Sequence, residues 1–175
     1  EIDSYAFEPP IDSSDIEPSI WVKLAELIQE KYELYDGFII LHGTDTMAYS
    51  ASVLSFMLEH LGKPVVFTGS QLPIGLLRTD GRDNLISAVE IASAKKLRSQ
   101  AMVPEVCIFF NSQLLRGNRA TKVDSTSFDA FSSPNYPALA DAGINIRYHE
   151  HAIHYPSRLE RPLQTHTELD TRVAV

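Results

Sequence analysis

The chain has 175 residues, of which 44% are apolar and 22% are charged, and its formal net charge is −8. This length and balance are typical of one globular domain and argue against a disordered chain. The acidic balance argues against binding to nucleic acid, and no apolar run approaches the roughly 20 residues of a membrane-spanning helix. We therefore predict a cytoplasmic protein that binds neither nucleic acid nor membranes.

The first half of the chain alternates between helical and strand patterns. Apolar residues spaced by three, four and seven positions predict an amphipathic helix over 18–34, which ends before the Asp-Gly pair at 36–37. The apolar run 38–41 is typical of a buried parallel strand. A second helix is predicted over 48–61, and the Gly-Lys-Pro segment 62–64 ends it.

The same pattern then repeats. Residues 65–67 are predicted as a strand, 84–96 as a helix capped by Asp83, and 106–110 as a third strand. The single cysteine, Cys107, lies in this third strand and is interpreted as an inert core thiol. This alternation predicts a doubly wound, Rossmann-like α/β fold with a mainly parallel sheet and helices on both faces.

The composition changes near residue 155. A polar, proline-bearing stretch begins there and is typical of an interdomain linker, and 171–175 is typical of the start of a strand. We therefore predict one α/β domain over 1–154, incomplete at its N-terminus. We interpret 155–175 as a linker and the start of a second, smaller α/β domain that is absent from this chain.

The polar turn after the strand 38–41 is the main candidate site. Ligands of open α/β sheets bind at the carboxyl ends of the strands, where Thr44 and Asp45 follow this strand. Gly43 lets the backbone approach a ligand closely, and the helix that begins near Thr46 directs free amides toward a bound carboxylate. A hydroxyl beside a carboxylate can hold an amino acid and orient an attacking oxygen. The alternative is a helix N-cap pair.

Such a hydroxyl needs a base, and Lys122 in the polar segment 116–122 is the candidate. A partly buried lysine beside a carboxylate can relay a proton, whereas the alternative is a solvated surface lysine. Ser13 and Ser14 follow Asp12, and this pattern alone is typical of a turn or a cap.

Two further segments lack the spacing of a cofactor site. Zinc-binding helices place two histidines four residues apart, but the histidines at 149, 151 and 154 do not, and we expect His149 and His151 on one face of a partly exposed strand. Residues 75–81 lack the glycine spacing of a phosphate-binding loop. The polar residues at 78–82 are expected to form a flexible loop or a subunit contact. We therefore predict no metal and no nucleotide cofactor.

Most of the chain resembles the bacterial-type L-asparaginase family. Residues 36–48 (DGFIILHGTDTMA) resemble the second signature of the family, and 62–71 (GKPVVFTGSQ) resemble the segment that follows it. The similarity continues through 109–111 and 116–122. Residues 11–14 (IDSS) and the RGNR run at the start of the last segment resemble the type I, cytoplasmic branch.

The resemblance implies roles for the candidate residues. Thr44, Asp45 and Lys122 correspond to the Thr-Lys-Asp triad of the family, in which the lysine polarises the threonine or an attacking water. Asp45 would also bind the substrate ammonium, and Asp12 and Ser13 would hold the amino-acid head group, Ser13 through its hydroxyl. Backbone amides near Thr44 would bind the oxyanion. The implied reaction is cofactor-free hydrolysis of L-asparagine to L-aspartate and ammonia through an acyl intermediate.

The resemblance also has a gap. The family's other threonine, which forms the acyl-enzyme, lies in a Thr-Gly-Gly-Thr-Ile-like motif that a lid tyrosine follows, and this sequence contains neither. We therefore expect a truncated piece of a longer enzyme rather than a natural pseudoenzyme, and we expect the piece alone to be inactive. The family further implies homodimers or homotetramers with an allosteric response to asparagine. Two alternatives stay open: a non-catalytic asparagine or aspartate sensor, and the amidase subunit of a tRNA-dependent amidotransferase, which the acidic charge disfavours.

Overall fold

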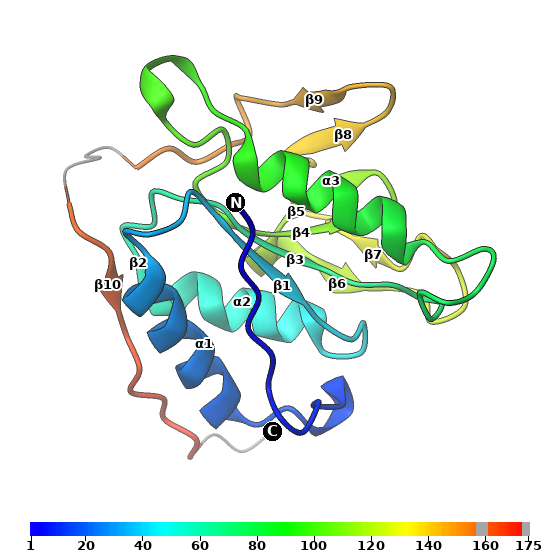
Figure 1. The fold of residues 1–175 in the computed structure, drawn as a ribbon, viewed down its shortest axis with the longest axis horizontal. Coiled ribbons are helices and arrows are strands. Elements are labelled where there is room, and N and C mark those ends of the chain that lie inside the picture. Colours follow the sequence, from blue (N-terminus) through cyan, green and yellow to red (C-terminus); the bar gives the residue numbers. More distant parts are fainter. Residues whose placement is uncertain (157–160, 173–175) are drawn as a thin grey trace.

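A six-stranded mixed sheet separates two layers of helices in the computed structural model, which describes residues 1–156 and 161–172 (Figure 1). In spatial order its strands are β1 (Phe38–Leu41), β3 (Val65–Thr68), β4 (Val106–Phe110), β5 (Gln113–Arg116), β8 (Ala140–Ala142) and β9 (Ile146–Tyr148). Strands β1, β3 and β4 pair in parallel, whereas β4, β5, β8 and β9 pair antiparallel. The predicted α/β class is confirmed, and the parallel strands are those that the sequence predicts.

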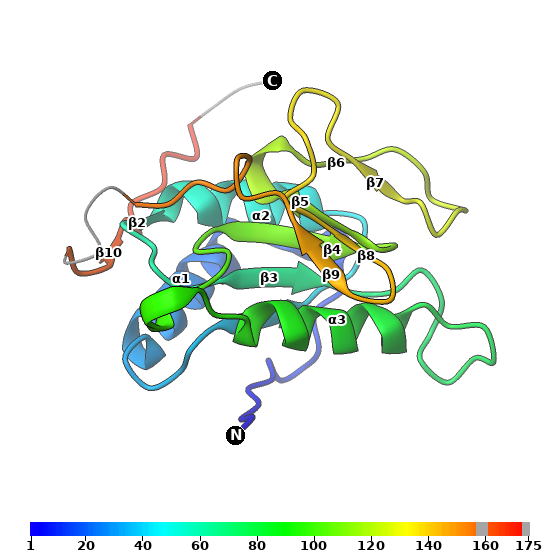
Figure 2. The same cartoon turned by 90° about the horizontal axis from the view of Figure 1, so that it is seen from above.

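Helices cover both faces of this sheet, as predicted (Figure 2). Helix α3 (Gly81–Ser93) lies on one face, and α1 (Pro18–Lys31) and α2 (Met47–Met57) lie on the other. Successive side chains of β3 point to opposite layers: Phe67 packs in the cluster with α1 and α2, and Val66 packs in the cluster with α3. Strands buried on both faces need apolar residues at every position, which explains their continuous apolar runs.

Shorter elements connect these layers. They are the 3₁₀ helices η1 (Ser13–Asp15), η2 (Leu97–Ser99) and η3 (Gly117–Arg119) and the two-stranded ribbons of β2 (Leu58–Glu59) with β10 (Gln164–Thr165) and β6 (Thr121–Lys122) with β7 (Phe131–Ser132). A tight turn joins β4 to β5, and its residues Asn111 and Ser112 have φ of 45° and 66°. Positive φ at both central residues is what a two-residue hairpin turn requires.

The ends of the three predicted helices differ from the structure. Helix α3 covers Gly81–Ser93 rather than 84–96. Helix α1 ends at Lys31 rather than at Leu34, whose side chain is 70% exposed and therefore does not hold the last turn on the core. Helix α2 ends at Met57 rather than at residue 61, because Leu58–Glu59 form β2 and pair with β10. Pairing with a distant strand decided this boundary, and no local pattern reports it.

Part of the predicted linker packs on the domain. The amide of His166 donates to the carbonyl oxygen of Met57 at 2.8 Å, next to the pairing of β10 with β2. Leu163 and Leu169 pack against the core cluster of α1 and α2. The boundary between domain and linker stays a prediction, and most of the strand start predicted over 171–175 lies outside the described residues.

Cys107 lies inside the sheet, in β4. Its side chain is fully buried, and its thiol lies 3.7 Å from the carbonyl oxygen of Val65. Burial raises the pKa of the Cys107 thiol well above its usual range. The prediction of a core thiol is confirmed.

The prediction of a strand that carries His149 and His151 is wrong, because β9 ends at Tyr148 and the chain then turns. His149 Nε2 lies 2.8 Å from a carboxylate oxygen of Asp141, and this contact lowers the pKa of Asp141. Within 1–156 and 161–172, no three His, Cys, Asp or Glu side chains converge as potential metal ligands.

Candidate active site

The turn between β1 and α2 carries the first part of the candidate site. After Leu41, residues 42–46 cross the carboxyl ends of the parallel strands. Gly43 lies against η1, because a side-chain carbon built on Gly43 would stand 2.4 Å from Ser13 Oγ. Thr46 Oγ1 donates to the carbonyl oxygen of Ser13 at 2.5 Å, across 33 positions of the sequence. These contacts bring the predicted head-group loop to the predicted catalytic turn.

Lys122 brings the second part of the site to this turn. It lies in β6, and its Nζ donates to Thr44 Oγ1 at 2.9 Å and to Asp45 Oδ1 at 2.8 Å. The Lys122 side chain is 18% exposed, whereas that of Asp45 is 64% exposed. Most of the Lys122 side chain is thus buried, and the carboxylate of Asp45 is open to solvent. The three side chains predicted as a triad meet, and their catalytic roles stay a prediction.

Neither alternative for these residues describes the structure. The N-cap of α2 is Thr46, which makes no side-chain capping bond, so Thr44 and Asp45 are not an N-cap pair. Lys122 is not a solvated surface lysine, because its ammonium contacts two side chains of the turn.

Asp12 caps η1. Its Oδ1 accepts hydrogen bonds from the amide of Ser14 at 2.9 Å and from the Ser14 hydroxyl at 2.8 Å, and these bonds lower the pKa of the Asp12 carboxyl. The cap interpretation therefore applies to Asp12 and Ser14. Ser13 between them is buried against Gly43. The substrate-binding roles of Asp12 and Ser13 stay a prediction.

The His42 side chain links the turn of residues 42–46 to helix α2. Its Nδ1 lies 2.7 Å from the carbonyl oxygen of Gly43, and its Nε2 lies 2.9 Å from Ser50 Oγ, which accepts a hydrogen bond from Trp21 Nε1 at 2.8 Å. A neutral imidazole with its proton on Nδ1 satisfies this arrangement, because Nε2 then accepts the proton of the Ser50 hydroxyl. Burial lowers the pKa of His42 from its ordinary 6.5.

We expect His42 to make the protein less stable in mild acid. The unfolded chain binds a proton at His42 below pH 6.5. The folded chain resists this proton, so the unfolded state binds more protons and stability falls as pH falls through this value. Melting temperatures at about pH 7.5 and about pH 5.5 should differ more in the unsubstituted protein than in His42→Gln. An equal difference in both proteins would contradict this role.

Gly69 permits a close approach between two turns of the site. It follows β3, and a side-chain carbon built on it would stand 2.3 Å from the carbonyl oxygen of His42. The amide of His42 donates to the carbonyl oxygen of Thr68 at 2.9 Å, which fixes this backbone in place. The carbonyl oxygen of His42 therefore cannot move away easily from a side chain added at Gly69.

Replacement of Gly69 by alanine should therefore destabilise the protein by about 1–3 kcal/mol through overpacking. Gly75→Ala is the matched control, because no atom lies within 4 Å of the added carbon. We expect that control to change stability by less than about 0.5 kcal/mol. Urea unfolding of both variants measures the difference. Equal midpoints would contradict the prediction, because the turns at His42 and Gly69 would then move apart without cost.

Two residues of this region were missed by sequence reasoning. The carboxylate of Asp80 accepts hydrogen bonds from the amides of Gln71 and Leu72 and from Asn84 Nδ2, so the prediction of a flexible loop over 78–82 is wrong for Asp80. Asp80, not Asp83, is the N-cap residue of α3, and Asp83 lies in the first turn. The available signal was the aspartate at the start of the helix together with an asparagine four positions later, because residues with this spacing share one helix face.

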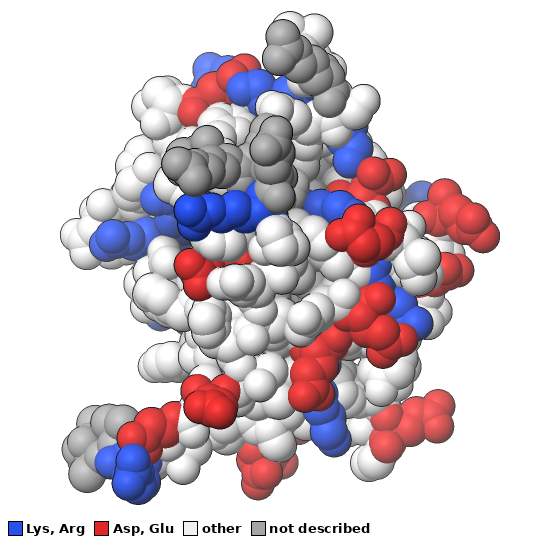
Figure 3. Space-filling model, turned by 90° about the vertical axis from the view of Figure 1, so that its left-hand side faces the viewer, with Lys and Arg blue, Asp and Glu red and all other residues white. Residues whose placement is uncertain are grey.

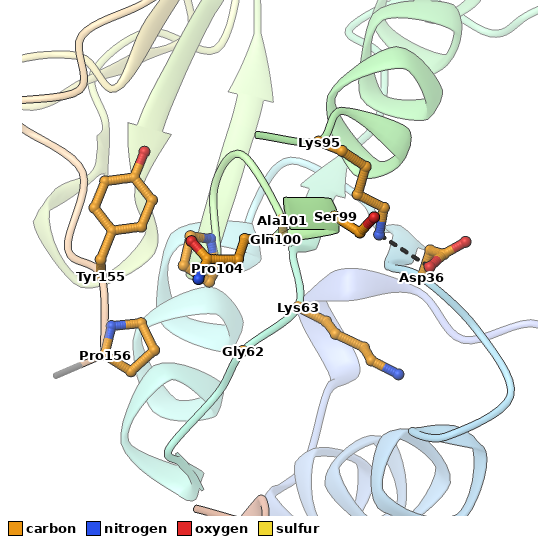
Figure 4. A pocket seen from close by; sticks show the side chains of 10 residues that line it. All are labelled: Asp36, Gly62, Lys63, Lys95, Ser99, Gln100, Ala101, Pro104, Tyr155 and Pro156. Carbon is orange, nitrogen blue, oxygen red and sulfur yellow. Dashed lines mark hydrogen bonds and ion pairs between the residues drawn. The ribbon is translucent and has the colours of Figure 1, made fainter. Parts of the chain in front are cut away.

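A separate hollow lies at the opposite end of the parallel strands (Figure 4). It has a volume of about 300 Å³ and is lined in part by Gly62, Lys63 and Pro104, which precede β3 and β4. Its charged side chains have partners: Lys95 Nζ lies 2.9 Å from a carboxylate oxygen of Asp36, and Lys63 Nζ donates to a backbone carbonyl. Since ligands of such sheets bind at the carboxyl ends of strands, this hollow is not the candidate site.

Comparison with known proteins places the chain in a family. L-asparaginase 1 of Escherichia coli (strain K12) is 54% identical over 143 residues, which are 82% of this chain and 40% of that protein. The 60 kDa lysophospholipase of Mus musculus is 53% identical over 139 residues, which are 79% of this chain and 24% of that protein. The chain thus spans less than half the length of these relatives.

A solved structure shows the same fold. The crystal structure of L-asparaginase I from Vibrio cholerae O1 biovar eltor superposes with a TM-score of 0.81 at 45% identity, over 93% of this chain and 47% of that one. The family model described as "Asparaginase, N-terminal" matches residues 2–154. The chain therefore belongs to the asparaginase N-terminal domain family.

Proposed function

We propose that the protein containing this chain hydrolyses L-asparagine to L-aspartate and ammonia. The observation that carries the proposal is the contact of one shielded ammonium, that of Lys122, with both a hydroxyl and an open carboxylate at the carboxyl ends of the sheet. The names of the asparaginase relatives agree with this reaction. The resemblance implies that no metal or nucleotide takes part.

The reaction divides into two acyl transfers. A threonine from the family's other motif, outside this chain, attacks the side-chain amide carbon of asparagine; an O–C bond forms, the C–N bond breaks, and the proton of the threonine hydroxyl passes to the leaving nitrogen, which departs as ammonia. Water then attacks the acyl carbon, the ester C–O bond to the threonine breaks, and a proton of the water returns to the threonine oxygen as aspartate leaves. In this second step Thr44 orients the water, and Lys122 polarises the Thr44 hydroxyl through its contact with Oγ1.

The same turn would hold the substrate. Asp45 has an exposed carboxylate that can pair with the ammonium of an amino acid while it also contacts Lys122. Ser13 and Asp12 would face the other end of the head group, since η1 lies against Gly43. Backbone amides near Thr44 would stabilise the oxyanion.

We further propose the domain organisation and assembly that the family implies. The catalytic domain would cover 1–154 and continue through a linker into a second α/β domain, and the protein would act as a cytoplasmic homodimer or homotetramer. No helix in the described part of the chain is long and apolar enough to cross a membrane. An amidotransferase subunit that approaches tRNA would need an extended basic surface; on the face in Figure 3 the basic side chains form only a short band beside acidic ones.

Ammonia release by the purified whole protein tests the proposal, with L-asparagine and L-glutamine as parallel substrates and calorimetry to measure binding. Turnover of asparagine supports the hydrolase. Binding of asparagine without ammonia release contradicts it and supports the non-catalytic sensor. If the protein neither binds asparagine nor releases ammonia, both the hydrolase and the sensor are rejected.

A further inference from the structure

We infer that Asp80 and Asn84, which lie outside the predicted triad, are positioning residues for that triad. They hold the turn formed by residues 69–72, called here the 69–72 turn, against two segments of the candidate site. One segment carries Thr44 and Asp45 and the other carries Lys122, and they are called here the two arms of the site. The inference rests on the proposed function, because it assigns these two residues to the same reaction. It follows from three sets of contacts.

The first set fastens the 69–72 turn to the start of α3. Both carboxylate oxygens of Asp80 lie 3.0 Å from the amide nitrogen of Gln71, and one lies 3.2 Å from that of Leu72. Asn84 is 3% exposed, and its Nδ2 donates to the carbonyl oxygen of Gly69 at 3.0 Å and to Asp80 at 3.2 Å. Backbone groups at both ends of the turn are thus bonded to two side chains of one helix.

The second set joins the 69–72 turn to the arm that carries Thr44 and Asp45. Gly69 packs on the carbonyl oxygen of His42, so closely that no side-chain carbon fits between them. His42 in turn contacts the carbonyl oxygen of Gly43, next to Thr44. A shift of the turn therefore reaches the triad threonine through two residues.

The third set joins the 69–72 turn to the arm that carries Lys122. Gln71 Nε2 donates to the carbonyl oxygen of Ser127 at 3.0 Å. Ser127 lies in the loop that connects β6, which contains Lys122, to β7. Since Lys122 and Thr44 come from arms that are 78 positions apart, the 69–72 turn is a bridge between them.

The consequence concerns rate more than substrate affinity. The 69–72 turn contacts both the arm of Thr44 and the arm of Lys122. The head-group loop is attached to the Thr44 arm by the contacts of Ser13 with Gly43 and Thr46, so a shift of the turn would move these substrate-holding residues together and change mainly their distance from Lys122. Displacement of a reacting group by about 1 Å costs up to about 10²-fold in rate. Loss of the Asp80 carboxylate should therefore lower kcat by about 10- to 100-fold and change KM by less than about threefold.

The test uses Asp80→Ala in the whole protein, with Asp83→Ala as the matched control. Asp83 carries the same charge near the same end of α3 but is exposed, and its side chain makes no hydrogen bond or ion pair within the described residues. Asp80→Asn keeps an acceptor oxygen and the volume of the side chain, so it should fold and recover part of the lost kcat. Hydrogen exchange at the Gln71 and Leu72 amides gives a second measurement that needs no activity.

We expect faster exchange at these two amides and a lower kcat in Asp80→Ala, an intermediate result in Asp80→Asn, and neither change in Asp83→Ala. Faster exchange with an unchanged kcat would overturn the positioning role. An equal loss of kcat in Asp83→Ala would overturn it as well, because a general effect of helix charge would then suffice. Absence of turnover in the unsubstituted protein would instead reject the proposed function, while the exchange rates would still report whether Asp80 holds the turn.

Discussion

Replacement of Lys122 by methionine is expected to lower the rate of ammonia release from L-asparagine by about 10²- to 10⁴-fold, the range for loss of a proton-transfer group. The Lys122 side chain is only 18% exposed, and methionine keeps much of its apolar part. It removes the ammonium that contacts Thr44 and Asp45. Steady-state kinetics of the whole protein measure the change.

Lys95→Met is the matched control for this prediction. Lys95 also contacts an aspartate, Asp36, at 2.9 Å, but this pair lies by the hollow at the opposite end of the sheet. Its replacement should leave the rate unchanged. If Lys122→Met kept most of the activity, or if both variants lost it equally, Lys122 would have no special part in proton transfer.

Replacement of Glu105 by glutamine is expected to destabilise the protein by about 3–5 kcal/mol. Glu105 and Arg116 form an ion pair at 2.6 Å, and their side chains are only 9% and 16% exposed. Removal of one charge leaves the other buried without compensation. Glu105 also accepts the amide of His154, and Arg116 donates to the carbonyl oxygen of Ala152, so the pair ties β4 and β5 to the end of the domain.

The pair between Lys96 and Glu150 provides the control. It has the same distance of 2.6 Å, but Glu150 is 60% exposed. Glu150→Gln should therefore cost no more than about 1 kcal/mol. Guanidinium unfolding of the two variants compares these values. A small loss in Glu105→Gln would contradict the prediction, because it would mean that water reaches the Arg116 side chain readily.

Local patterns in the sequence are sufficient to predict several elements of this fold. The strands of 38–41 and 106–110 are predicted with their observed bounds from uninterrupted apolar runs. Strand 106–110 is buried at every position, as such a run predicts, whereas 38–41 is only half-buried and Leu41 is exposed, so the prediction of a buried strand is wrong there. The candidate residues Thr44 and Asp45 followed from the rule that ligands bind where such strands end. Lys122 was proposed as their partner, but its distance from them could not be derived from spacing.

The contacts between distant segments cannot be predicted from these local patterns. The contact of Lys122 with Thr44 spans 78 positions, and the end of α2 depends on a strand more than 100 positions away. The role of Asp80 was misjudged because a carboxylate in a polar loop has the same local signal whether water or backbone amides surround it. Local propensity depends on neighbours along the chain, whereas hydrogen bonds and burial depend on neighbours in space, and these are known only once the chain has folded.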